Sequence, residues 1–131
     1  MRILICLFLG VWTLAACQNG SARQGAMLYA QACAGCHGPE GAGDGAKGAD
    51  LPVPAPDLRQ LAQRHGGAFP TAPVMAKIHG YRGRDLDGLM PAFGPALTGP
   101  DLPVTLADGT RVMAPAGLVA LTRYLETLQE E

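Results

Sequence analysis

The spacing of apolar residues predicts a chain made mainly of helices. Near the start, small and apolar side chains recur three and four positions apart, as on one face of a helix, at Gly25, Leu28, Tyr29, Ala32 and Cys33. Near the end, residues 115–129 predict the clearest helix, because Pro115 suits a first turn and leucines follow at the same spacing. Those leucines are Leu118, Leu121, Leu125 and Leu128.

Shorter elements are expected between these two helices. Residues 57–64 predict a short helix with Asp57 in its first turn and Gly66 just past its end, and residues 72–78 predict a second that stops near Gly80. Residues 104–112 alternate apolar and polar positions around Asp108-Gly109, which favours a small hairpin. The predicted fold class is all-α, with a short β-hairpin before the last helix.

The rest of the chain is rich in glycine and proline. Residues 38–50 hold five glycines, so this stretch can turn sharply, and residues 51–56 alternate proline into an extended segment. A bland flexible loop and a loop that folds back around a site would look alike here.

The N-terminal stretch indicates export. Residues 1–16 carry one positive charge, at Arg2, followed by an apolar run that is too short to span a membrane. The sequence before Cys17 resembles the lipobox of bacterial lipoproteins, in which the cysteine is lipidated and becomes the new N-terminus. The alternative is a secretory signal cut nearby, which would leave Cys17 as a free thiol. We expect a signal peptide at 1–16, a lipidated Cys17 with a flexible tether at 17–24, and one domain at 25–131.

The strongest chemical signal is C-x-x-C-H at residues 33–37. Two thiols at this spacing lie on one side of a turn, so Cys33 and Cys36 can form thioethers to one haem, with His37 as the proximal iron ligand. A structural zinc site would need a second ligand pair, and the remaining cysteines, Cys6 and Cys17, do not form one. A thioredoxin-like dithiol would need a βαβ pattern that is missing here. One covalent haem c is therefore expected.

Charge argues against nucleic acid as a partner. The formal net charge is −1 and becomes one unit more negative if Arg2 leaves with the signal peptide. The sequence has no basic run, and its only lysines are Lys47 and Lys77. Strong electrostatic steering toward an acidic partner is therefore not expected.

With these residues in view, residues 25–129 resemble the class I cytochrome c family. Gly25 and Tyr29 match the glycine and aromatic of the family's first helix, and Tyr124 matches the aromatic of its last. The resemblance implies that these residues pack where the two helices cross. It also implies that the Pro56 carbonyl accepts a hydrogen bond from the proximal His37, and that Met90 is the sixth iron ligand. Residues 98–113 form an insertion relative to shorter members of the family.

Other side chains compete with Met90 as the sixth ligand. Met75 is the next candidate but lies in an amphipathic helix, where methionine is more often filler, and Met27 is expected in the core. Met113 abuts the last helix. His65 and His79 both sit near helix C-termini, where an imidazole is favourable without any ligand role.

Iron held by His37 and Met90 leaves no open position for a substrate, so the expected function is one-electron transfer and not enzymatic catalysis. The alternatives are a fixed cytochrome subunit of a larger membrane redox complex, or a small haem peroxidase or ligand sensor. The expected partners are unidentified redox proteins, the expected state is a monomer, and the expected location is the periplasmic side of a bacterial membrane.

Overall fold

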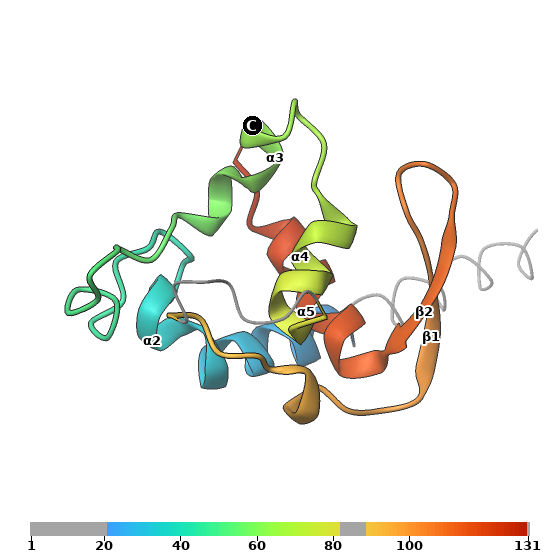
Figure 1. Ribbon diagram of the computed structural model, residues 1–131, viewed down its shortest axis with the longest axis horizontal. Helices are drawn as coiled ribbons and strands as arrows, with labels where there is room; N and C mark the ends of the chain where they lie inside the picture. Colours follow the sequence, from blue (N-terminus) through green and yellow to red (C-terminus); the bar gives the residue numbers. More distant parts are fainter. Residues whose placement is uncertain (1–20, 82–88, 131) are drawn as a thin grey trace, which may run out of the picture.

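The computed structural model describes residues 21–81 and 89–130, which are mostly helical with one two-stranded sheet (Figure 1). Residues 21–32 are helical. The later elements are α2 (Ala34–His37), the 3-10 helix η1 (Leu58–Gln60), α3 (Leu61–Arg64), α4 (Thr71–His79), the 3-10 helix η2 (Gly94–Ala96), β1 (Asp101–Thr105), β2 (Arg111–Pro115) and α5 (Ala116–Thr127). This confirms the predicted class of small helices with a hairpin before the last one.

The helix of residues 21–32 crosses α5 at very close range. A Cβ atom at Gly25 would collide with the carbonyl oxygen of Ala120 and the Cβ of Tyr124, so the crossing requires glycine. Beside it, the rings of Tyr29 and Tyr124 lie 5.3 Å apart between centroids, tilted by 51°. Aromatic pairs at this separation and tilt attract each other beyond their apolar contact. The predicted packing of Gly25 with two aromatics is confirmed.

Two expectations for this helix are wrong. Residues 21–24 are already helical, although residues 17–24 were expected to form a flexible tether. Ala22, Arg23 and Gln24 suit a helix, and the Ser21 hydroxyl accepts a hydrogen bond from Arg123 of α5 at 3.5 Å. Met27, expected in the core, is 59% exposed, because positions two apart on a helix do not share a face and Gly25 faces α5. Cys17 lies outside the described residues.

The two short helices form where the sequence predicts them. The Asp57 carboxylate caps η1 by accepting a hydrogen bond from the Arg59 N–H at 2.9 Å, and α3 follows directly. Helix α4 ends at Gly80, whose φ of 88° is left-handed and whose N–H donates to the Ala76 carbonyl at 3.0 Å. Thr71 is the first residue of α4 and makes no cap, since Pro70 occupies the cap position.

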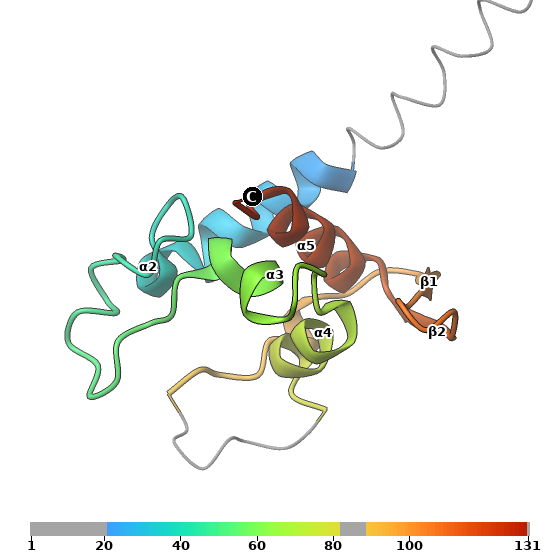
Figure 2. The same ribbon diagram turned by 90° about the horizontal axis from the view of Figure 1, so that it is seen from above.

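The predicted hairpin is confirmed and is longer than expected. Strands β1 and β2 pair antiparallel from Asp101 opposite Pro115 to Thr105 opposite Arg111. In the turn, the Asp108 carboxylate accepts a hydrogen bond from the Thr110 N–H at 2.9 Å. Figures 1 and 2 show the hairpin at the opposite end of the molecule from α2.

A single apolar cluster joins the helices. Its fully buried side chains include Tyr29 on the first helix and Leu118 and Leu121 on α5. Around them lie Cys33, Val74, Met75, Ile78, Leu97, Ala114, Val119 and Leu125. Cys33 is therefore anchored in the core at the point where the chain enters the C-x-x-C-H turn.

Candidate functional site

A cavity of about 400 Å³ opens beside the C-x-x-C-H turn, a size typical of cofactor sites. Two stretches of chain provide most of its lining. The attachment segment, residues 32–65, contributes Ala32, Cys33, Cys36, His37, Leu51, Val53, Pro54, Ala55, Pro56, Leu58, Leu61 and His65. The methionine segment, residues 70–81 and 89–93, contributes Pro70, Pro73, Val74, Lys77, Ile78, Leu89, Met90, Pro91 and Phe93. The lining is mainly apolar.

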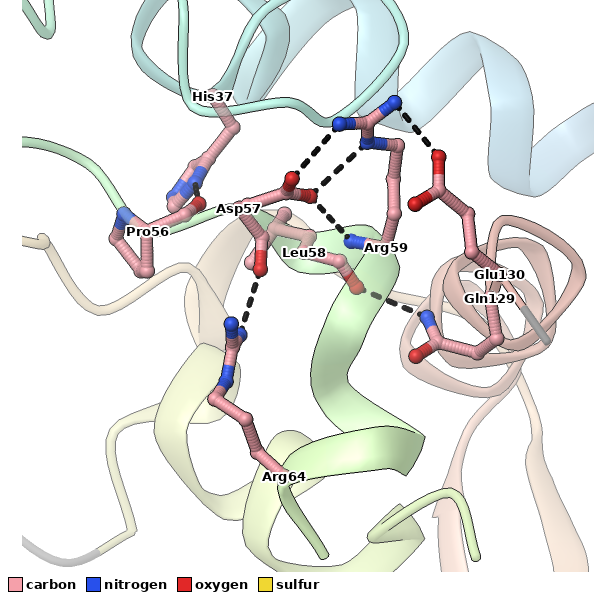
Figure 3. Close-up of polar contacts among 8 residues, drawn as sticks. All are labelled: His37, Pro56, Asp57, Leu58, Arg59, Arg64, Gln129 and Glu130. Atoms are coloured by element: carbon pink, nitrogen blue, oxygen red, sulfur yellow. Dashed lines mark hydrogen bonds and ion pairs between the residues drawn. The ribbon is translucent and has the colours of Figure 1, made fainter. Parts of the chain in front are cut away.

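His37 is buried at the end of α2, with 8% of the residue exposed. Its ring Nδ1 lies 3.1 Å from the Pro56 carbonyl oxygen (Figure 3). Because a carbonyl can only accept, Nδ1 carries a proton, and in the neutral imidazole Nε2 then keeps its lone pair. This is the contact that the resemblance implies for Pro56, and it holds the His37 ring by one oriented hydrogen bond.

The two thiols lie on the same cavity lining as His37. Cys33 is buried and Cys36 is half-buried. Burial, and to a lesser extent the nearby Cys36, raises the pKa of the Cys33 thiol to about 11. Within residues 21–81 and 89–130, no three His, Cys, Asp or Glu side chains gather where they could hold a metal ion.

The glycine-rich stretch after His37 folds back over the attachment turn. The N–H groups of Gly43, Gly45 and Lys47 donate to the carbonyls of His37 (2.8 Å), Cys36 (3.2 Å) and Gly35 (2.8 Å) respectively. These bonds satisfy carbonyls that the end of α2 leaves without helical partners. Gly43 has a φ of 84°, and a Cβ there would collide with the Ala55 carbonyl. The glycine therefore lets the loop lie directly against the residues that lead to Pro56.

Met90 lines the same cavity as His37, whereas Met75 does not. Nearby, the Phe93 N–H donates to the Ile78 carbonyl at 2.8 Å, which ties the chain after Met90 to the end of α4. Met75 is 6% exposed and belongs to the apolar core, as its helical spacing predicted. Met113 is 61% exposed on the hairpin. Among the described methionines, Met90 is the one that shares a cavity with His37.

The two other histidines differ in position. His65 lines the cavity, is itself exposed, and donates from Nδ1 to the Leu61 carbonyl at 2.8 Å. His79 does not line the cavity; its ring stacks on Tyr81 with centroids 3.5 Å apart. A Cβ at Gly94 would contact the same ring of His79. His79 is thus engaged in packing.

Several supporting contacts could not be predicted from the amino-acid pattern. The Tyr29 hydroxyl donates to the Gly38 carbonyl at 2.6 Å, and burial is the main cause that raises the pKa of this phenol to about 12, so it stays protonated. Arg59 donates to the Asp57 carboxylate, and Gln129 donates to the carbonyl of the next residue, Leu58 (Figure 3). Polar residues at the ends of predicted helices show no periodic pattern. Their contact partners therefore become known only from the structure.

A comparison with protein families matches residues 22–129 to the family described as Cytochrome c. The chain belongs to the cytochrome c family. Membership implies a covalently bound haem c and a haem-based electron carrier. Neither a comparison with curated proteins nor one with solved structures gave a significant match.

The site of this cytochrome c domain fits haem c on its own chemistry. It offers two thiols for thioether bonds, an imidazole whose Nε2 keeps its lone pair, and a thioether side chain, around an apolar cavity. These groups are Cys33, Cys36, His37 and Met90. In the part of the chain that the structure describes, no helix is long and apolar enough to cross a membrane.

Proposed function

We propose that this chain is a class I, monohaem c-type cytochrome that carries one electron at a time between redox proteins. Cys33 and Cys36 would hold the haem through thioethers, and His37 and Met90 would bind its iron. The observation that carries the proposal is that one apolar cavity brings together both thiols, the Pro56-bonded imidazole and Met90. The sequence contains one C-x-x-C-H motif, which supports a single haem.

Each group has a definite task in electron transfer. The haem, when bound, supplies the one-electron chemistry of its iron. The Pro56 carbonyl keeps the proton on Nδ1 of His37 and so keeps Nε2 available as a ligand. Met90 would be the second protein ligand of the iron and would favour the reduced state, since thioether ligation raises the potential. The apolar lining excludes water, which limits the charge rearrangement that accompanies each transfer.

Covalent attachment is tested on a denaturing gel stained for haem. The wild-type chain should keep its stain, because thioether bonds survive unfolding. A C33S/C36S double variant should lose it, whereas the Met75→Ala variant, which changes the core and leaves the thiols intact, should keep it. A wild-type chain whose haem washes out would overturn the proposal.

We also propose that the mature protein is anchored by acyl chains on Cys17 and faces the periplasm. The motif before Cys17 supports this, and the helix at residues 21–32 makes the connection short. Four residue steps separate Cys17 from Ser21, a span of at most about 14 Å when extended. A domain held this close would search for partners in nearly two dimensions, which raises their effective concentration.

The Cys17→Ser variant tests the anchor, because it removes the acylation site and leaves the haem domain unchanged. Wild type should remain with the membrane fraction, since two or more acyl chains make release slow. The variant should appear in the soluble periplasmic fraction with its haem intact. Equal partitioning of both proteins would show that Cys17 is only part of a signal peptide.

A further inference from the structure

The orientation of His37 depends on a carbonyl, and that carbonyl lies at the start of a polar network (Figure 3). Pro56 accepts from Nδ1 of His37 and is followed directly by Asp57. The Asp57 carboxylate accepts hydrogen bonds from Nε and Nη2 of Arg59 at 3.0 and 2.8 Å, in addition to the Arg59 backbone N–H. The guanidinium of Arg59 therefore holds the side chain of the residue that directly follows Pro56.

Gln129 and Glu130, which follow α5, connect this network to the C-terminal part of the chain. The Glu130 carboxylate pairs with Nη1 of Arg59 at 2.7 Å, and the Glu130 N–H donates to the Arg59 carbonyl at 2.9 Å. Glu130 has an exposed side chain, so its ion pair alone contributes little. Its backbone contact nevertheless brings the end of the chain against η1.

Gln129 makes the central contacts of this junction. Its Nε2 donates to the carbonyls of Leu58, at 2.9 Å, and Leu125, at 2.7 Å, and its Oε1 accepts from the Ala62 N–H at 2.9 Å. Helix ends leave such N–H and C=O groups without helical partners, so one partly buried amide satisfies groups at the end of α5 and at the start of α3. Leu58 is only two residues from Pro56.

We propose that Gln129 is a positioning residue for the proximal ligand: by holding the Leu58 carbonyl, it fixes the segment that presents the Pro56 carbonyl to His37. Gln129 contacts neither His37 nor Pro56, so it acts through the chain between them. A well-aligned bond from Nδ1 makes the imidazole a stronger donor to iron, and a stronger donor favours the oxidised state. The inference rests on the proposed function for its effect on potential, but the positioning itself is a property of the chain.

The experiment compares Gln129→Ala with Val119→Ala. Val119 is buried on α5 but does not line the haem cavity, so its truncation should lower stability mainly through lost packing. Gln129→Ala should shift the reduction potential to a more positive value and speed the exchange of the His37 Nδ1 proton. Val119→Ala should change neither, although it lowers the melting temperature.

A second variant separates the critical contact from general loosening. Gln129→Glu keeps an acceptor for the Ala62 N–H but replaces the amide donor to the Leu58 and Leu125 carbonyls with an oxygen, so it should shift potential and proton exchange in the same direction as Gln129→Ala. If both variants keep the wild-type potential and exchange rate, or shift no further than Val119→Ala, Gln129 is only a helix cap and the inference is wrong. If the wild-type chain carried no haem, the proposed function would fail, and the exchange of the His37 proton alone would still decide the role of Gln129.

Discussion

The two stretches that line the cavity are held in different ways. In the attachment segment, hydrogen bonds fix the ligand: Nδ1 of His37 donates to the Pro56 carbonyl. Arg59 donates to the Asp57 carboxylate, and Gln129 donates to the Leu58 carbonyl. In the methionine segment, apolar packing of α4 dominates, with Met75 and Ile78 buried in the core. Hydrogen bonds are directional, whereas apolar packing fixes volume and proximity. We infer that the attachment segment controls the orientation of its ligand, and that the methionine segment controls whether its ligand is present.

The largest expected contrast lies within the methionine segment. Met90→Ala should lower the reduction potential and let the reduced protein bind carbon monoxide, because a thioether ligand that favours ferrous iron is lost. Met75→Ala should cost about 2–5 kcal/mol of stability through lost packing and leave the ligation unchanged. Potentiometry, carbon monoxide difference spectra and denaturant titration measure these effects. Loss of the near-infrared methionine-to-iron band in Met75→Ala, with its survival in Met90→Ala, would reverse the assignment.

A smaller effect should come from the packing that supports the attachment segment. Gly25→Ala should destabilise the fold by about 1–3 kcal/mol, because the new Cβ meets the backbone of Ala120 and α5 must move. Gly35→Ala is the matched control, since its Cβ would meet only the side chain of Lys47, whose nearest atom is 3.1 Å away and can shift. Chemical denaturation of both variants checks the prediction. Equal losses would mean that the helix crossing is not tight.

The smallest effect is a pH dependence in the attachment segment. The side-chain hydrogen bond from Arg59 is the main cause that lowers the pKa of Asp57, with smaller contributions from its backbone N–H and from Arg64. Because the folded pKa is depressed, the stabilisation is present above the ordinary aspartate value of about 4 and is lost as pH falls through the lower folded value. Asp57→Asn should flatten the stability profile in that acid range.

The matched control for this variant is Asp108→Asn in the hairpin turn. The pKa of Asp108 is also lowered, chiefly by the backbone N–H of Thr110, so this variant too should flatten part of the acid profile. Only Asp57→Asn should also shift the reduction potential, since Asp57 adjoins Pro56. Thermal melts and potentiometry distinguish the two variants. Both are measured between about pH 2 and neutral, the range in which carboxylates titrate. A potential shift of the same size in Asp108→Asn would contradict the separate role of the attachment segment.

The same contrast explains which parts of the site could be predicted from the sequence. Cys33, Cys36 and His37 are adjacent in the chain, so their chemistry follows from local spacing alone. Pro56 was assigned through a family resemblance, because nothing local shows which carbonyl meets Nδ1 of His37. Gln129 could not be assigned at all: its contacts to Ala62 and Leu58 span 67 and 71 residues.

The errors have a related cause. Met27 is expected in the core because it lies on the helix that leads into the attachment site, but its position relative to Gly25 puts it on the other face of that helix. Residues 21–24 are small or polar and lack apolar periodicity, which predicts a tether, but they are helical and Ser21 contacts Arg123 of α5. Met90 lines the cavity and Met75 lies in the core, as expected because helical spacing distinguishes a core position from a loop, and the choice of Met90 as iron ligand stays a prediction. In both errors, the packing of the first helix on α5 determines the structure, and this packing cannot be read from local spacing.

The crossing of the first helix with α5 also sets an order of events during biosynthesis. The contact between Ser21 and Arg123 spans 102 residues, and the partner that packs on Tyr29, Tyr124, lies equally late in the chain. Until α5 packs on the first helix, the chain lacks part of the core that buries Cys33. Because Cys33 is buried once the core has closed, haem attachment and folding compete in time, and variants that fold faster than they are modified should accumulate as colourless protein.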